Sequence, residues 1–195
     1  LESGEELLAD RVLFAPGSSK KIWDLLEGLG HRIVSPVPSL FTFNIRDPRT
    51  AELAGVSVPN VRVTVPVGGL ETEGPLLITH WGLSGPAILK MSAFGARWMA
   101  DQDHRFTVFV NWLPQYDAEQ LMDELNGLRK DVSHQRKRVL SNAMFGIPLR
   151  LWRNLGAFAR IPETANWSDL SKPQLRKWAE VLTESAFSVV GKSTH

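Results

Sequence analysis

The pattern of hydrophobic and polar positions divides the chain into three stretches. The first runs to about His31 and predicts a strand, a glycine turn and a helix. The apolar run Arg11–Ala15 suits a buried strand, and Pro16-Gly17 ends it. A serine cap before an apolar stripe and a glycine after it predict the helix. These positions are Ser18 or Ser19 for the cap, Ile22, Leu25, Leu26 and Leu29 for the stripe, and Gly30 for the stop.

The second stretch, from about Ile33 to Leu113, is rich in proline, glycine and β-branched residues. Short segments that alternate apolar and polar residues, or are wholly apolar, predict strands over 41–45, 61–65, 70–72, 76–79 and 106–112. One helix, from about Gly85 to Met99, interrupts them and is apolar on nearly every side, so we expect it to be buried. Several short strands with turns between them favour a small β-barrel or a strongly bent sheet.

The third stretch, from Pro114 to about Phe187, has a helical pattern. Capping boxes at Asp117–Gln120 and Ser171–Gln174 predict two helix starts. Ser133 is predicted to cap a further helix that runs to about Met144. Gly146 and then Pro148 separate that helix from the next one, which carries Leu149, Trp152 and Leu155 at helical spacing. The chain closes with a predicted strand over 187–190.

These elements predict an α+β fold, in which a small β-barrel and a helical subdomain are flanked by short strand–helix and strand pieces of a host α/β domain. The expected boundaries are 1–32 for a remnant of the host, 33–113 for the barrel-like part, 114–186 for the helical subdomain and 187–195 for a strand that returns to the host. The chain lacks an initiator methionine and stops abruptly at Gly191–His195. Both ends therefore predict cuts through a longer polypeptide.

Composition narrows the function classes. The 195 residues include 22 basic and 21 acidic residues, and this near-zero net charge indicates that nucleic acid is an unlikely partner. Residues 1–113 carry 10 basic and 12 acidic residues and residues 114–195 carry 12 and 9, an asymmetry too small to name a partner. The absence of cysteine excludes disulfides, thiolate zinc sites and cysteine catalysis, and fits a cytoplasmic location. No apolar run reaches the roughly 18 residues of a membrane span.

The most unusual stretch is Leu76–Leu89, which predicts a strand, a glycine turn and a helix. Ser84 occupies the expected N-cap position and Pro86 the first helical turn. Two functional alternatives stand beside capping: the helix N-terminus could hold a phosphate or carboxylate, or Ser84 could be the nucleophile of a serine hydrolase. His80 fits either a proton donor or ligand contact, or a histidine satisfied by backbone. Trp81 is the tryptophan that we expect to line a cavity.

The remaining chemical signals are weaker. Arg129–Arg138 holds five basic residues in ten, which fits a phosphate-binding patch or, as we favour because no aromatic residue is interleaved, a solvated helix end. The five histidines lack the spacing of a metal site, so we predict no metal. The chain contains neither a G-x-G-x-x-G nor a G-x-x-x-x-G-K-[ST] motif, so no standard dinucleotide site is expected.

Four stretches carry a resemblance to a known family. They are Arg11–Gly17, Leu26–Leu40, Leu77–Ala87 and Phe187–Gly191, of which Leu77–Ala87, with the letters LITHWGLSGPA, is the most specific. In these stretches, and in order over essentially the whole chain, the sequence resembles the central part of the BaiN-like (YhiN-like) family of NAD(P)/FAD-dependent oxidoreductases.

The resemblance implies that the chain is the insert domain of a flavoprotein, which covers FAD and shapes the substrate side and is inactive alone. It implies FAD in the full-length protein, with NAD(P)H as a possible electron donor and no cofactor on the fragment. Segments 1–32 and 187–195 would belong to the FAD domain. The expected partners are the rest of the polypeptide and an unknown small molecule, with no membrane.

The resemblance also assigns candidate site residues. Ala15, Pro16 and Gly17 match the strand end that approaches FAD in the family. The expected substrate-side residues are Thr79, His80, Trp81 and Ser84, of which His80 and Ser84 are the catalytic candidates. The alternative function, which the residues alone suggest, is a stand-alone phosphate-binding or nucleic-acid-binding module that uses Arg129–Arg138 as a basic helix.

Overall fold

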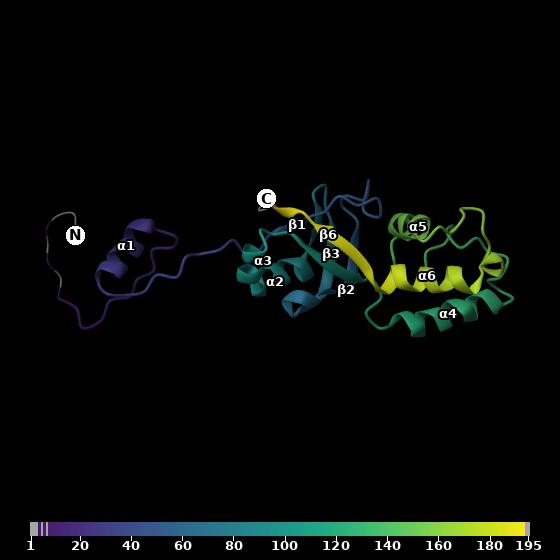
Figure 1. Cartoon of the computed structure of the whole chain (residues 1–195), viewed down its shortest axis with the longest axis horizontal. Coiled ribbons are helices and arrows are strands. Elements are labelled where there is room, and N and C mark those ends of the chain that lie inside the picture. The colour runs from purple at the N-terminus through teal and green to yellow at the C-terminus, as the bar shows by residue number, and fades with distance from the viewer. Residues whose placement is uncertain (1–3, 5, 7, 194–195) are drawn as a thin grey trace. The chain divides into compact units, whose positions relative to one another are not determined.

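The computed structural model describes residues 4, 6 and 8–193, so the outermost residues of the first and last expected segments lie outside the described part. The chain separates into two compact units, Leu1–Pro36 and Val37–His195. The first unit contains α1 (Lys20–Gly28), which confirms the predicted helix (Figure 1). The predicted strand over Arg11–Ala15 is wrong: it is irregular, and Leu13 is 90% exposed. A strand needs a partner strand, and the described residues of this unit include none.

The second unit is built around a seven-stranded antiparallel sheet with the order β6-β5-β2-β3-β4-β1-β7. Its strands are β1 (Thr42–Asn44), β2 (Ser57–Val65), β3 (Leu70–Ile78), β4 (Gly82–Ser84), β5 (Phe106–Asn111), β6 (Ser185–Val189) and β7 (Gly191–Ser193). The helices α2 (Pro86–Phe94) and α3 (Ala96–Asp101) lie between β4 and β5 in the chain, and α2 packs against β3. Together with the helices described below, this sheet confirms the predicted α+β class.

One continuous segment supplies both ends of this sheet. β6 pairs with β5 at one end, and after Val190 the chain continues as β7, which pairs with β1 at the other end. The amide N–H of Val190 donates to the carbonyl oxygen of Asn44, which holds the link between the two strands. The arrangement is therefore barrel-like. The predicted closing strand has its partners inside this sheet, and its return to a host domain stays a prediction.

Three boundaries differ from the sequence prediction. Segments 70–72 and 76–79 were expected as separate strands, but they form the single strand β3, because a register shift in β2 between Val58 and Val61 accommodates Gly74 and Pro75. The expected glycine turn at Gly82 is the strand β4. The expected helix over 85–99 is divided at Gly95, where the side chains of Leu70 and Met99 approach closely.

The helical subdomain consists of α4 (Ala118–Lys130), α5 (Leu149–Phe158), the short 3-10 helix η2 (Trp167–Asp169) and α6 (Lys172–Thr183). Both predicted capping boxes are present, since Asp117 and Ser171 accept hydrogen bonds from the N–H groups of Gln120 and Gln174. The predicted helix after Ser133 is wrong. Asp131 accepts hydrogen bonds from the N–H and hydroxyl of Ser133, which forms a turn in place of a helix start.

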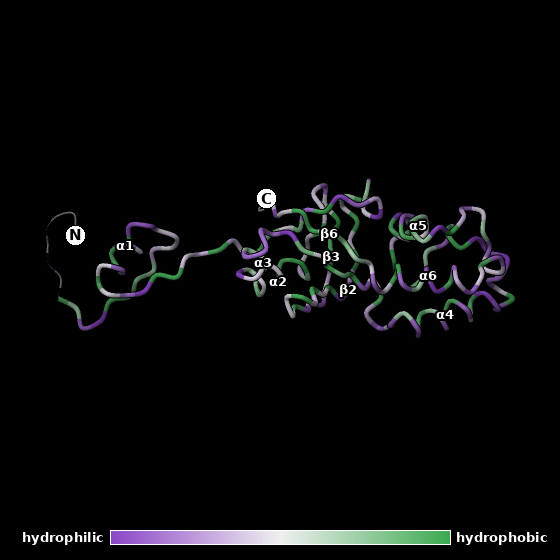
Figure 2. The backbone as a smooth tube through the Cα atoms, viewed as in Figure 1, coloured by the Kyte–Doolittle hydropathy of each residue, from purple (hydrophilic) through white to green (hydrophobic). Residues whose placement is uncertain are grey.

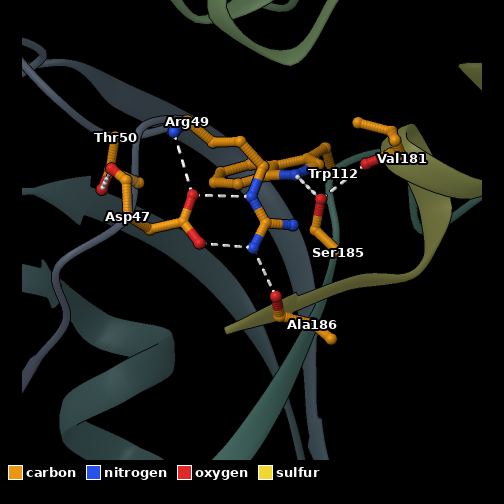
Figure 3. A network of polar contacts seen from close by, with 7 residues as sticks. All are labelled: Asp47, Arg49, Thr50, Trp112, Val181, Ser185 and Ala186. Carbon is orange, nitrogen blue, oxygen red and sulfur yellow. Dashed lines mark hydrogen bonds and ion pairs between the residues drawn. The ribbon is translucent and has the colours of Figure 1, made fainter. Parts of the chain in front are cut away.

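Apolar faces of these elements form one core that runs from the sheet into the helical subdomain. Figure 2 shows hydrophobic and hydrophilic segments alternating along α4 and α6, as expected for helices with one buried face. Trp152 of α5 and Trp178 of α6 meet edge to face at 4.7 Å between ring centroids. At the junction, the indole N–H of Trp112 donates to Ser185, which donates in turn to the carbonyl oxygen of Val181 (Figure 3).

Candidate nucleic-acid interface

Charge is unevenly distributed along the helical subdomain. Residues 129–177 contain eleven lysines and arginines and three aspartates and glutamates, whereas residues 117–124 contain four acidic residues and no basic one. α4 and α6 pack against each other, with the basic end of α4 near the start of α6 (Figure 1). We call the exposed lysines and arginines of 129–177 the basic end of the subdomain. The excess of eight positive charges in residues 129–177 is hidden in the near-zero net charge of the chain.

The segment Arg129–Arg138 is not the basic helix that the sequence suggested. Arg129 and Lys130 form the last turn of α4, and the rest is a run of turns that packs against residues 165–170. Val139 donates its N–H to the carbonyl oxygen of Ala165, and Arg129 donates to that of Leu170 at 3.0 Å. These contacts fix the turns, so their exposed side chains project from a defined backbone.

Most cations of the basic end have no acidic partner within the described structure. The ion pairs found in 129–177 are His134 with Asp131 and Lys177 with Glu180. Backbone and side-chain hydrogen bonds from Ser133, together with the bond from His134, lower the pKa of Asp131 to about 2, so this carboxylate is already satisfied locally. The exposed side chains of Arg136, Lys137 and Arg138 are therefore available to external anions.

α5 extends the basic surface. Arg153 donates to the carbonyl oxygen of Leu140 at 3.2 Å and lines a cleft of about 350 Å³ together with Arg138, Ser141 and Glu163. One turn earlier, Arg150 donates to the carbonyl oxygen of Glu52 in the loop that precedes β2. The arginines of α5 thus connect the basic end to the barrel-like sheet.

Three of the residues expected on the substrate side, Thr79, His80 and Trp81, lie on the turn between β3 and β4, and the fourth, Ser84, ends β4. The hydroxyl oxygen of Thr79 accepts from the N–H groups of Trp81 and Gly82, each at 3.2 Å, and the carbonyl oxygen of Trp81 accepts from Ile45 at 2.8 Å. Thr79 and His80 line the same cavity, whereas Trp81, which was expected to line a cavity, is not among its lining residues and is 57% exposed. This turn is therefore tightly held, and it presents an aromatic ring to solvent.

Ser84 does not cap α2. It ends β4, and Gly85 occupies the N-cap position, so the predicted cap is wrong. The hydroxyl of Thr42 donates to the Ser84 oxygen at 3.0 Å, and no histidine is bonded to Ser84 in the described structure. This serine lacks the base that a hydrolase nucleophile needs.

The other expected site residues lie elsewhere. Ala15, Pro16 and Gly17 belong to the first unit, where they are exposed and irregular. No group of three or more histidine, aspartate or glutamate side chains among the described residues is placed to hold a metal ion. Within the same part of the chain, every helix is too short or too polar to cross a membrane.

The fold and this surface define a barrel-like α+β protein with a basic helical subdomain. A family model described as HI0933-like protein barrel and H2TH domain matches residues 37–194, and the chain belongs to this family. It is 30% identical over 152 residues to ribosomal RNA dihydrouridine synthase of Escherichia coli, covering 76% of this chain and 34% of that protein. It is 28% identical over 137 residues to the protein of the same name from Haemophilus influenzae, covering 69% and 31%. The chain thus spans about a third of these relatives.

The comparisons confirm the flavoprotein-like family to which the sequence was assigned, but they correct two predictions. Both relatives are named for a modification of ribosomal RNA. These names contradict the prediction that the chain is the insert domain of an FAD oxidoreductase with a small-molecule substrate. They also contradict the prediction that nucleic acid is an unlikely partner. The prediction about nucleic acid failed because it used the net charge of the whole chain. In that sum, acidic residues outside 129–177 balance the local basic excess.

Proposed function

We propose that this chain is an RNA-binding part of an enzyme that modifies ribosomal RNA, and that the basic end of its helical subdomain binds the phosphate backbone. The observation that carries the proposal is the excess of eight positive charges in 129–177, most of them on exposed side chains that have no acidic partner within the described structure. The names of the two relatives support the same class of substrate.

The chemistry of the backbone explains why this surface suits RNA. Each phosphate that a lysine or arginine neutralises releases condensed counterions, and this supplies sequence-independent affinity. Hydrogen bonds hold the turns at 131–141 and the helix α5, which carry the cations, in place. Little conformational entropy is therefore lost from these segments when RNA binds. The acidic start of α4 repels phosphate and restricts the contact to the outer part of the subdomain.

Conversion of uridine to dihydrouridine adds two hydrogen atoms to the base and needs a reductant, for which a flavin is the candidate from the family resemblance. The described residues that the resemblance places next to FAD do not form a flavin cradle. Ala15, Pro16 and Gly17 are exposed, a Cβ placed on Gly17 would meet no atom within 4 Å, and the chain has no glycine-rich fingerprint. We therefore assign RNA binding to this chain and derive no hydride step from it.

The test is the affinity of the chain for a fragment of ribosomal RNA, measured by fluorescence anisotropy at fixed salt. The triple variant Arg136→Glu, Lys137→Glu, Arg138→Glu reverses three exposed charges in the turns and should weaken binding by at least ten-fold. A matched control is Lys20→Glu with Lys21→Glu, two exposed cations on α1. The control should bind as the unchanged protein does, and equal weakening by both variants would contradict the proposal.

A further inference from the structure

We propose that the cleft between the turns at 131–141 and α5 holds one phosphate and its ribose from the RNA backbone, and that Glu163 in this cleft selects RNA over DNA. Arg138 and Arg153 bind the phosphate, and the Glu163 carboxylate accepts a hydrogen bond from the ribose 2′-hydroxyl. This inference rests on the proposed function and names a specificity-determining residue within the same surface. The 2′-hydroxyl is the group by which a protein distinguishes RNA from DNA.

Three segments of the helical subdomain line the cleft. They are the end of the basic turns, one face of α5 and the loop that follows α5. The polar residues that they contribute are Arg138, Ser141, Arg153, Glu163 and Thr164. The volume of about 350 Å³ lies within the roughly 300–1,000 Å³ typical of small-ligand sites, so the cleft has room for a phosphate with its ribose.

Backbone contacts hold the walls of the cleft in place. The N–H of Val139 donates to the carbonyl oxygen of Ala165 at 3.0 Å, which ties the basic turns to the loop. The N–H of Ile161 donates to the carbonyl oxygen of Gly156 at 2.9 Å, which ties the loop to the end of α5. Leu140 packs directly on Gly156, where an added Cβ would lie 2.3 Å from a Leu140 methyl carbon. The cleft is therefore preformed, and little conformational entropy is lost when a ligand enters it.

The cleft offers hydrogen-bond donors to a phosphate. Arg153 uses its Nε on the carbonyl oxygen of Leu140 at 3.2 Å, which leaves its two terminal nitrogens for a ligand. The guanidinium of Arg138 has no hydrogen bond or ion pair within the described structure, and its side chain is exposed. Guanidinium groups bind phosphate oxygens through pairs of parallel hydrogen bonds, so two of them fit a backbone phosphate.

Glu163 is the lining residue that phosphate binding alone does not explain, because a carboxylate repels a phosphate. Its side chain is exposed and makes neither a hydrogen bond nor an ion pair with any described residue, so neither arginine of the cleft neutralises it. A carboxylate can only accept hydrogen bonds, and the ligand must therefore supply the donor. The 2′-hydroxyl is a donor that every RNA nucleotide carries near its phosphate and that DNA lacks.

The experiment measures the affinity of the 195-residue chain for a short fragment of ribosomal RNA and for a 2′-fluoro copy of the same sequence, at fixed salt. Fluorine keeps the RNA-like helical geometry and removes the hydroxyl donor. The unchanged protein should bind the RNA about ten-fold more tightly than the copy, as expected for a hydrogen bond to a charged acceptor. Glu163→Ala should lower this ratio to about one, since the acceptor is lost.

Two further variants separate this role from a general effect of charge. Arg153→Gln removes a phosphate contact and should weaken binding of both oligonucleotides by about five-fold. The matched control is Glu124→Ala, which removes an exposed carboxylate of α4 that does not line the cleft. It should change both affinities by the same factor and leave their ratio as in the unchanged protein. All three side chains are exposed, so the variants should fold, as circular dichroism can verify.

Equal affinity of the unchanged protein for the RNA and its 2′-fluoro copy overturns the inference, and this comparison needs no variant. A ratio that Glu163→Ala leaves unaltered, or unchanged binding by Arg153→Gln, overturns it as well. If the charge-reversed variant of 136–138 loses binding in any of these cases, the proposed function stands without this site. An unchanged protein that does not bind the RNA overturns both.

Discussion

The guanidinium carbon of Arg49 lies 3.9 Å from the centroid of the Phe187 ring, which belongs to β6. The same group lies 4.3 Å from the Phe158 ring of α5 and donates to the carbonyl oxygen of Ala186. Arg49 thereby connects the loop at 46–52 to both the sheet and the helical subdomain. Burial would raise the pKa of Asp47, but the hydrogen bonds from Arg49 outweigh it and hold that pKa below its usual value.

Arg49→Met should lower the free energy of unfolding by about 3 kcal/mol, because the Asp47 carboxylate is left largely buried without its partner. Urea denaturation measures the loss. The double variant with Asp47→Asn should lose less than the sum of the two single variants, since the two residues form one pair. Additive losses, or a cost below about 0.5 kcal/mol for Arg49→Met, would contradict this role.

Gly82→Ala should destabilise the protein by at least about 2 kcal/mol. Gly82 has a φ of +146°, and a Cβ there would lie 2.2 Å from the carbonyl oxygen of Phe43. Gly127→Ala, on the exposed face of α4 with no atom within 4 Å of the new Cβ, should instead stabilise it by about 0.5–1 kcal/mol. Thermal unfolding of the two variants should move the Tm in opposite directions.

His104 should make the protein less stable in mild acid. Burial lowers its pKa, Lys192 lowers it further and Asp103 opposes both, and its ring packs edge to face on Phe41. Because the unfolded state takes up the proton more readily, the free energy of unfolding should fall as the pH drops below about 6.5. His104→Asn, which tolerates the positive φ of 55° at this position, should reduce the difference in Tm between pH 7.5 and pH 5.5. If the difference in Tm between the two pH values is the same in His104→Asn as in the wild-type protein, His104 is not the cause of the loss of stability in acid.

Ser171→Ala should cost about 1 kcal/mol, because the serine oxygen caps α6 at the Gln174 N–H. Ser84→Ala should leave the start of α2 unaffected, since Gly85 occupies that cap. An active-site fluorophosphonate probe should not label the wild-type protein at Ser84. If the probe labels the wild-type protein and this labelling is lost in Ser84→Ala, the claim that Ser84 is not a hydrolase nucleophile is contradicted.

Local signals in the sequence were sufficient for most elements. The two capping boxes fixed the starts of α4 and α6, alternation identified β1 and the second half of β2, and segment 106–112 was predicted as the strand that is β5. The strand over 11–15 failed because an apolar run forms a strand only where a partner is present. The helix after Ser133 failed because Asp131, two residues earlier, competes for the same N–H groups.

The candidate interface was harder to predict, because its residues come together only in the fold. The basic residues lie in separate segments at 129–138, 150–160 and 172–177, and the packing of α4, α5 and α6 gathers them. A charge count over whole halves of the chain averages them with the acidic start of α4. Thr79 and His80, which line the cavity, were singled out from their motif, and their role at a site stays a prediction; the loop at 46–52 that also lines the cavity gave no signal of its own.

The salt dependence of RNA binding tests the central claim most directly. For the wild-type chain, the logarithm of the association constant should fall linearly with the logarithm of the salt concentration, by roughly 0.7–0.9 for each phosphate contact. The variant Arg136→Gln, Lys137→Gln, Arg138→Gln should show a slope that is shallower by about 2, as expected from the loss of two to three contacts. The same slope for both proteins would contradict the claim that the basic end holds the RNA backbone.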